Sequence, residues 1–103
     1  MNRISAAEAA ALLAAGEHEL VDVREPHEWA GGHLPGARHV PLGVLAAAPH
    51  RHLPRDRVIF VCGHGVRSLT ACAVAERAGL RDVSSLDGGT AGWVAEGRPL
   101  DYG

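Results

Sequence analysis

The chain contains no lysine, because all ten of its basic residues are arginines. This excludes any mechanism that needs a Schiff-base or proton-transferring lysine. Aromatic residues are also few, with two tryptophans, one tyrosine and one phenylalanine. The net charge at pH 7 is only −2, so nothing in the charge balance favours nucleic acid or an anionic membrane surface as a partner.

Cysteine is scarce as well, with Cys62 and Cys72 as the only two. Two cysteines make no disulfide framework, and neither stands at a metal-ligand spacing. Long hydrophobic runs are missing near the amino terminus, where the longest unbroken apolar stretch covers residues 9–15. That is far shorter than a membrane span. We therefore expect a cytoplasmic protein with reduced thiols, no metal and no cofactor.

The composition of the 103 residues is otherwise that of a globular protein, with 47% apolar and 21% charged residues. These values exclude disordered and fibrous classes. The length suits one domain covering residues 1–103, with a single core and a shallow site.

Helix and strand patterns alternate along the chain. The run at 57–62 is apolar throughout, which is typical of a central strand in a parallel sheet. The spacing Ser5-Ala-Ala-Glu8 predicts a capped helix that buries Ala9, Leu12 and Leu13 and ends at Gly16. The alternation predicts an α/β fold with a mostly parallel central sheet and helices on both faces. The further expected elements are strands at 19–23, 37–40 and 83–86, helices at 26–29, 42–47, 67–79 and 90–96, and loops at 31–36 and 50–54.

The segment after the central strand carries the chemistry. Ligands of open α/β folds bind beyond the carboxyl ends of the strands, and Cys62 stands at that position. A cysteine there faces free backbone N–H groups and the positive end of the next helix dipole, and both stabilise a thiolate. Arg67 adds a positive charge on the same turn. Gly63 and Gly65 allow the backbone to turn its N–H groups inward.

This pattern predicts a sulfur nucleophile with an anionic substrate. We expect Cys62 to be the nucleophile and the rest of the loop to bind the substrate. His64 either assists through protonation near pH 6.5 or points to solvent. The binding loop consists of Gly63, His64, Gly65, Val66, Arg67 and Ser68.

The roles of Arg24 and Cys72, which are expected near this loop, can each be interpreted in two ways. Asp22 and Arg24 end the strand at 19–23, and we expect a buried ion pair that braces the strand ends. In the alternative interpretation, Arg24 contributes to the anion-binding site. Cys72 is expected to fill the core rather than to act as a resolving thiol.

The remaining histidines and tryptophans favour structural roles. His33 is expected to bond loop carbonyls. His50 and His52 lack a third ligand nearby, so no metal site is expected there. Trp29 and Trp93 are expected in the core, with a place in the pocket wall as the alternative.

The loop from Cys62 to Ser68 resembles the active-site loop of rhodaneses, which are sulfurtransferases with the pattern Cys-x-x-Gly-x-Arg-Ser. Two flanking stretches resemble the family's other motifs and stand in the family's order, so that the resemblance covers most of residues 4–97. The amino-terminal motif is Val21-Asp-Val-Arg-Glu25 with Glu28-Trp29 and Gly32-His-Leu-Pro-Gly-Ala37, and the carboxy-terminal one is Asp87-Gly-Gly-Thr-Ala-Gly-Trp93.

The resemblance implies a rhodanese domain with a persulfide cycle. Cys62 would attack the outer sulfur of a small anionic donor such as thiosulfate, and the sulfur would pass to cyanide, a thiol or a protein acceptor. Arg67 and the loop amides suit a dianion and the departing sulfite. The loop lacks the further basic side chain that some thiosulfate-preferring members carry, so the natural donor stays open.

Two other functions are compatible with these residues. One is a sulfur-relay or binding module with little turnover on thiosulfate. The other is a cysteine-based phosphatase or arsenate reductase, whose loops place five residues between cysteine and arginine. Here four residues separate Cys62 from Arg67, and the tighter ring suits a single sulfur atom better than a tetrahedral phosphate.

Overall fold

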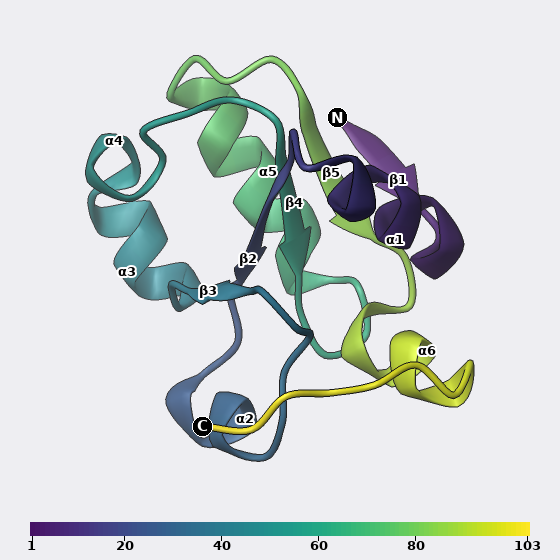
Figure 1. Cartoon of the computed structure of the whole chain (residues 1–103). Helices are drawn as coiled ribbons and strands as arrows, with labels where there is room; N and C mark the ends of the chain where they lie inside the picture. The colour runs from purple at the N-terminus through teal and green to yellow at the C-terminus, as the bar shows by residue number, and fades with distance from the viewer.

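The computed structural model describes all residues from 1 to 103. Five strands form one sheet in the order β1-β5-β4-β2-β3 (Figure 1). Every strand pairing is parallel, so the expected α/β architecture with a parallel sheet is confirmed. The strands are β1 (Asn2–Ile4), β2 (Glu19–Asp22), β3 (Arg38–His39), β4 (Val58–Val61) and β5 (Val83–Leu86).

Helices cover both faces of this sheet, as expected. On one face α3 and α5 pack over a core that includes Phe60, and on the other α1 and α6 pack over a core that includes Ile59. None of the helices is long and apolar enough to cross a membrane. The helices are α1 (Ala6–Ala15), α2 (Pro26–Ala30), α3 (Leu42–Ala47), α4 (Pro49–His52), α5 (Arg67–Arg77) and α6 (Gly89–Ala95).

The central strand β4 explains why the two cores form. Successive side chains of a strand point to opposite faces of the sheet. Val58 and Phe60 therefore enter the core under α5, and Ile59 and Val61 enter the core under α1. All four are almost completely buried. A strand buried on both faces needs an apolar residue at every position, which is the pattern seen in the sequence.

Helix α1 begins and ends as expected and buries Ala9 as expected, but Leu12 and Leu13 are not fully buried. Ser5 and Glu8 form the capping box, and Gly16 ends the helix with φ +83°. The fully buried side chains are Ala6 and Ala9. Leu12 and Leu13 are only half-buried at the border of the core, because small side chains are what bring this helix close to the sheet.

Two elements differ from the sequence expectation. Strand β1 was not predicted, because three residues are too few for a recognisable pattern and the strand forms through pairing with β5. The loop expected at 50–54 begins instead with the short helix α4. Pro49 occupies its first turn, where the fixed φ of proline and its missing N–H favour a helix start.

The parallel arrangement places the loops after β2, β4 and β5 at one edge of the sheet. Helices α2 and α6 lie at that edge, and the carboxyl terminus lies beside α2 (Figure 1). Residues far apart in the sequence therefore meet there, and Cys62 follows β4 directly.

Candidate active site

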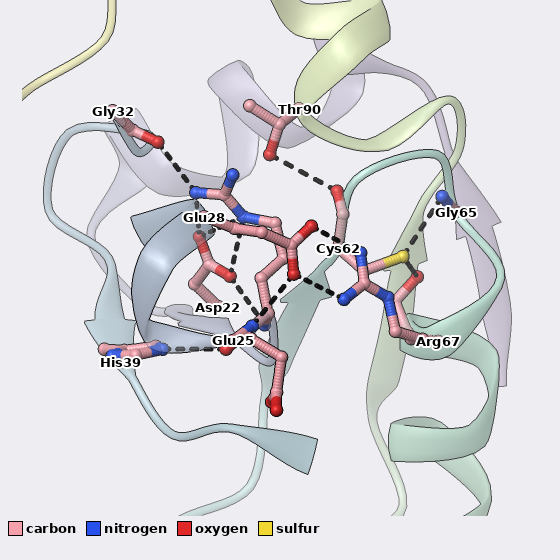
Figure 2. A network of polar contacts seen from close by, with 11 residues as sticks. Asp22, Glu25, Glu28, Gly32, His39, Cys62, Gly65, Arg67 and Thr90 are labelled. Carbon is pink, nitrogen blue, oxygen red and sulfur yellow. Dashed lines mark hydrogen bonds and ion pairs between the residues drawn. The ribbon is translucent and has the colours of Figure 1, made fainter. Parts of the chain in front are cut away.

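The Cys62 side chain is surrounded by hydrogen-bond donors from its own loop. The residue is only 1% exposed. The backbone N–H of Gly65 donates to Cys62 Sγ over 3.1 Å, as Figure 2 shows. Gly65 has φ +99°, a conformation that favours glycine and turns this N–H inward. Gly65 thus turns its amide to the sulfur as the glycine pattern predicts, whereas Gly63 has no positive φ.

Two buried serine hydroxyls extend this set of donors. Cys62 Sγ lies 3.4 Å from Ser68 Oγ, and Ser68 Oγ lies 2.6 Å from Ser85 Oγ. When Ser85 donates to Ser68, the Ser68 hydroxyl is free to donate to a thiolate at Cys62. Both serines are almost completely buried, so water does not compete with this hydrogen-bond chain.

These contacts lower the pKa of Cys62. Burial by itself raises the pKa of the thiol, because it disfavours the charged form. Hydrogen bonds from the Ser68 hydroxyl and from the backbone amides of Ser68, Gly65 and His64 outweigh burial, and the pKa lies below its ordinary value. Hydrogen-bond donors are the leading cause that favours the thiolate, and the Arg67 charge interacts with it as well.

The start of α6 holds the loop in this orientation. The backbone N–H of Thr90 donates to the Cys62 carbonyl over 2.8 Å, and the N–H of Ala91 donates to the Gly63 carbonyl over 3.0 Å. The Thr90 hydroxyl donates to the Cys62 carbonyl as well (Figure 2). With both carbonyls bonded to α6, the following amides remain available to the sulfur.

Arg67 is engaged by a carboxylate. Its Nη1 and Nη2 donate to Oε1 and Oε2 of Glu28 over 2.6 and 2.9 Å (Figure 2). The Arg67 hydrogen bonds lower the pKa of Glu28 to about 2, and Glu28 in turn raises the pKa of Arg67. The two charges therefore persist as a bidentate ion pair at any ordinary pH.

Arg24 forms a second ion pair, deeper in the molecule. Its Nε and Nη2 donate to the Asp22 carboxylate, and Nη2 also donates to the Gly32 carbonyl over 2.7 Å. Asp22 is fully buried and Arg24 is 6% exposed. The guanidinium thus connects the end of β2 to the loop at 31–36. This is the buried ion pair bracing the strand end that the sequence predicts.

The other loop residues face outward. His64 and Val66 are exposed, the latter at 72%. His64 contributes its backbone amide rather than its ring to the sulfur. Cys72 is a buried residue of α5 in the core, where burial raises the pKa of its thiol to about 11.

The aromatic and histidine side chains separate into two groups. Trp93 is in the core and donates from Nε1 to the Pro99 carbonyl over 2.7 Å. Trp29 is half-buried outside the core clusters, and its ring stacks on the rings of His33 and His39. The His33 Nδ1 lies 3.2 Å from the Leu34 carbonyl.

Comparison with known proteins identifies the family of this chain. A family model described as a rhodanese-like domain matches residues 5–96. The chain belongs to the rhodanese-like sulfurtransferase family. This rhodanese domain is 32% identical over 97 residues to the thiosulfate sulfurtransferase GlpE of Pseudoalteromonas translucida, a match that covers 89% of this chain and 88% of that protein.

Two further proteins resemble the rhodanese domain. The human single-domain sulfurtransferase TSTD1 superposes with a TM-score of 0.80 at 27% identity, covering 93% of this chain and 97% of the human one. The probable adenylyltransferase/sulfurtransferase MoeZ of Mycobacterium tuberculosis is 37% identical over 82 residues, or 78% of this chain. The matched part is only 21% of MoeZ, so the chain spans about a fifth of that protein.

Three residues of the rhodanese site were not assigned roles from the sequence. Glu28 and Thr90 stand inside the two flanking motifs, but their partners lie on other elements and cannot be read from local spacing. Ser85 left a weaker signal, because it is one of two serines inside a strand expected to be buried. A buried hydroxyl needs a hydrogen-bond partner, and that requirement points to Ser85.

The two thiols are expected to react with iodoacetamide at different pH. The thiolate is the reactive form, so the alkylation rate rises with pH and levels off above each thiol's pKa. Cys62 should react with an inflection below that of an ordinary cysteine, and Cys72 should stay unlabelled until the protein unfolds. Ser68→Ala should move the Cys62 inflection to higher pH. Alkylation followed by peptide mass spectrometry measures both.

The control for this experiment is Ser84→Ala, which removes the neighbouring buried hydroxyl on the opposite face of β5. This change should leave the Cys62 inflection where it is. An unchanged inflection in Ser68→Ala would contradict the assignment of the hydroxyl as a thiolate donor.

Proposed function

We propose that this rhodanese domain, taken as residues 1–103, transfers sulfane sulfur through a persulfide on Cys62. The observation that supports this best is the convergence of the Gly65 amide and the Ser68 hydroxyl on the Cys62 sulfur. A nucleophile that must carry negative charge in each step benefits from donors fixed before the reaction begins. A cytoplasmic location, where the thiol stays reduced, belongs to the same proposal.

The cycle has two displacement steps. The Cys62 thiolate attacks the outer sulfur of thiosulfate, the S–S bond of the donor breaks, and sulfite leaves with the electron pair. Cys62 then carries a persulfide whose terminal sulfur is anionic. A nucleophilic acceptor, such as cyanide, a small thiol or a protein thiol, attacks that terminal sulfur and releases the Cys62 thiolate. Sulfur is transferred without net oxidation or reduction.

The residues of the loop divide these tasks. The amides of His64, Gly65 and Ser68 and the Ser68 hydroxyl bind the anionic sulfur in both the thiolate and the persulfide. Arg67 provides the cation nearest to the donor, while Val66 and His64 lie on the exposed side that an acceptor reaches. Arg24 acts indirectly, because its hydrogen bonds to Asp22 and to the Gly32 carbonyl fix the end of β2 next to the site. Neither a nucleic acid nor a membrane takes part.

Mass spectrometry after thiosulfate treatment tests this function. The protein is incubated with thiosulfate, freed of excess donor, and measured intact and as peptides. The peptide containing Cys62 should gain one sulfur atom, and cyanide should remove that sulfur as thiocyanate. A protein that accepts sulfur from neither thiosulfate nor a persulfide would instead be a binding module.

A further inference from the structure

The Arg67 guanidinium, which lies beside Cys62 in Figure 2, is held by Glu28 on a different element. Glu28 belongs to α2 and Arg67 begins α5, and the two side chains meet through two parallel hydrogen bonds. Glu28 Oε1 also accepts the backbone N–H of Glu25 over 3.0 Å, which fixes the carboxylate against the start of α2. The Arg67 guanidinium and the Glu25 amide thus hold the Glu28 carboxylate in place before any substrate binds.

The carboxylate faces the loop beside the sulfur. A Cβ built on Gly63 would lie 3.1 Å from Arg67 Nη2 and 3.8 Å from Glu28 Oε2. Gly63 directly follows Cys62, so both members of the Arg67–Glu28 ion pair lie beside the loop that holds the sulfur, with the guanidinium the nearer of the two. The Glu28 charge therefore offsets the attraction that Arg67 alone would exert on an anionic donor.

The side-chain charges around the sulfur cancel in pairs. Arg67 is matched by Glu28, and Arg24 is matched by the buried Asp22. The Cys62 thiolate then leaves one negative charge in excess. The groups that contact the sulfur are neutral amides and hydroxyls, and such dipoles suit one sulfur atom rather than a dianion with a separate sulfonate end.

Neither cavity of the molecule encloses a donor at this site. A cavity of about 360 Å³ lies at the amino ends of the strands and is lined in part by His18 and Asp56. A second one of about 310 Å³ lies between α3, α4 and α5 and is lined in part by Ala46 and Arg77. The rest of the donor molecule therefore stays in solvent. The site can distinguish one sulfur donor from another only by the end that carries the transferred sulfur and by the charge of the donor.

We propose that Glu28 is a specificity-determining residue that favours thiol persulfides as sulfur donors over dianionic thiosulfate. This inference rests on the proposed sulfur transfer and names its donor class. The Cys62 thiolate attacks the outer sulfur of R–S–SH, the S–S bond breaks, and R–S⁻ leaves with the electron pair. The outer sulfur moves to Cys62 together with its proton, so charge and oxidation state balance.

The test compares two donors in single-turnover loading of Cys62, followed as the gain of one sulfur atom in rapidly quenched samples. The donors are thiosulfate and the persulfide of 2-mercaptoethanol, whose body carries no charge. Omitting cyanide avoids its direct reaction with persulfides. The proteins are the wild type, Glu28→Gln, and the matched control Glu25→Gln, which removes an exposed carboxylate from the same helix start without releasing Arg67.

Glu28→Gln removes the negative charge that pairs with Arg67, so the Arg67 charge becomes available to the sulfur donor. The glutamine side chain keeps a carbonyl oxygen that can still accept the Glu25 N–H. We expect the half-saturating thiosulfate concentration to fall by roughly tenfold, as expected for removing one close like charge. The limiting loading rate and the loading by the persulfide should each change less than about twofold, because the persulfide is attacked in its protonated form R–S–SH, which carries no charge to repel. Glu25→Gln should leave both donors unchanged.

Two results would overturn the assignment of Glu28. One is an equal effect of Glu28→Gln on both donors, which is what a purely structural role produces. The other is a wild-type protein that loads from thiosulfate more efficiently than from the persulfide, a measurement that holds even if the variant does not fold. Failure of both donors to load the wild type would instead refute the proposed function itself.

Discussion

Replacing Cys62 with serine is expected to abolish sulfur transfer while the fold is retained. Serine keeps the shape of the side chain, but its hydroxyl is a far weaker nucleophile and cannot form a persulfide. Loss of a covalent nucleophile lowers turnover by at least about 10³-fold. The measurement is thiocyanate formation from thiosulfate and cyanide, with circular dichroism to confirm the fold.

The control for this variant is Cys72→Ser, which removes the other thiol. Cys72 lies in the core and makes no hydrogen bond to the Cys62 sulfur. Sulfur transfer should therefore survive in Cys72→Ser, although burying a hydroxyl costs about 1–3 kcal/mol of stability. If Cys62→Ser kept normal activity, Cys62 would not be the sulfur carrier.

Gly89→Ala is expected to cause the largest loss of stability among single methyl additions in this chain. Gly89 has φ +58°, and an added Cβ would lie 2.7 Å from the carbonyl carbon and oxygen of Gly63 and still closer to the Cys62 carbonyl oxygen. These are backbone atoms that no side-chain rotation can move away. The strain of the left-handed conformation adds about 1–2 kcal/mol. We expect a total loss on the order of 4 kcal/mol or more, measured by urea unfolding.

The matched control is Gly97→Ala, at another left-handed glycine. Gly97 has φ +75°, but nothing lies within 4 Å of an added Cβ. This variant should lose only the conformational strain, about 1 kcal/mol. Because Gly89 packs on the Cys62 carbonyl, Gly89→Ala should also slow alkylation of Cys62, whereas Gly97→Ala should not. Equal stability losses in the two variants would show that the close approach at Gly89 is unimportant.

The parts of the fold that depend on strong local patterns were predictable. The uninterrupted apolar run of β4 and the capping box of α1 each follow from a physical requirement that acts within a few residues. The edge strand β1 has no such pattern, since its three residues gain their conformation from pairing with β5. Long-range pairing is the step that local periodicity does not encode.

The site shows the same division. The loop glycines and the position of Cys62 at the end of a strand pointed to a bound anionic sulfur, and the Gly65 amide does donate to that sulfur. The partner of Arg67 was not predictable, because Glu28 stands 39 residues away in the sequence. Arg67 was expected to serve the thiolate and the donor, but its hydrogen bonds go to that carboxylate.

The placement of Cys72 has a consequence for oxidative damage. A thiolate whose pKa is lowered, as at Cys62, is prone to become a sulfenic acid when a peroxide reaches it. Repair within the same molecule needs a second thiolate, and Cys72 stays protonated at neutral pH because it lies in hydrocarbon surroundings. Recovery of an oxidised molecule therefore depends on a reductant from outside, and its lifetime under stress follows the thiol concentration of its surroundings.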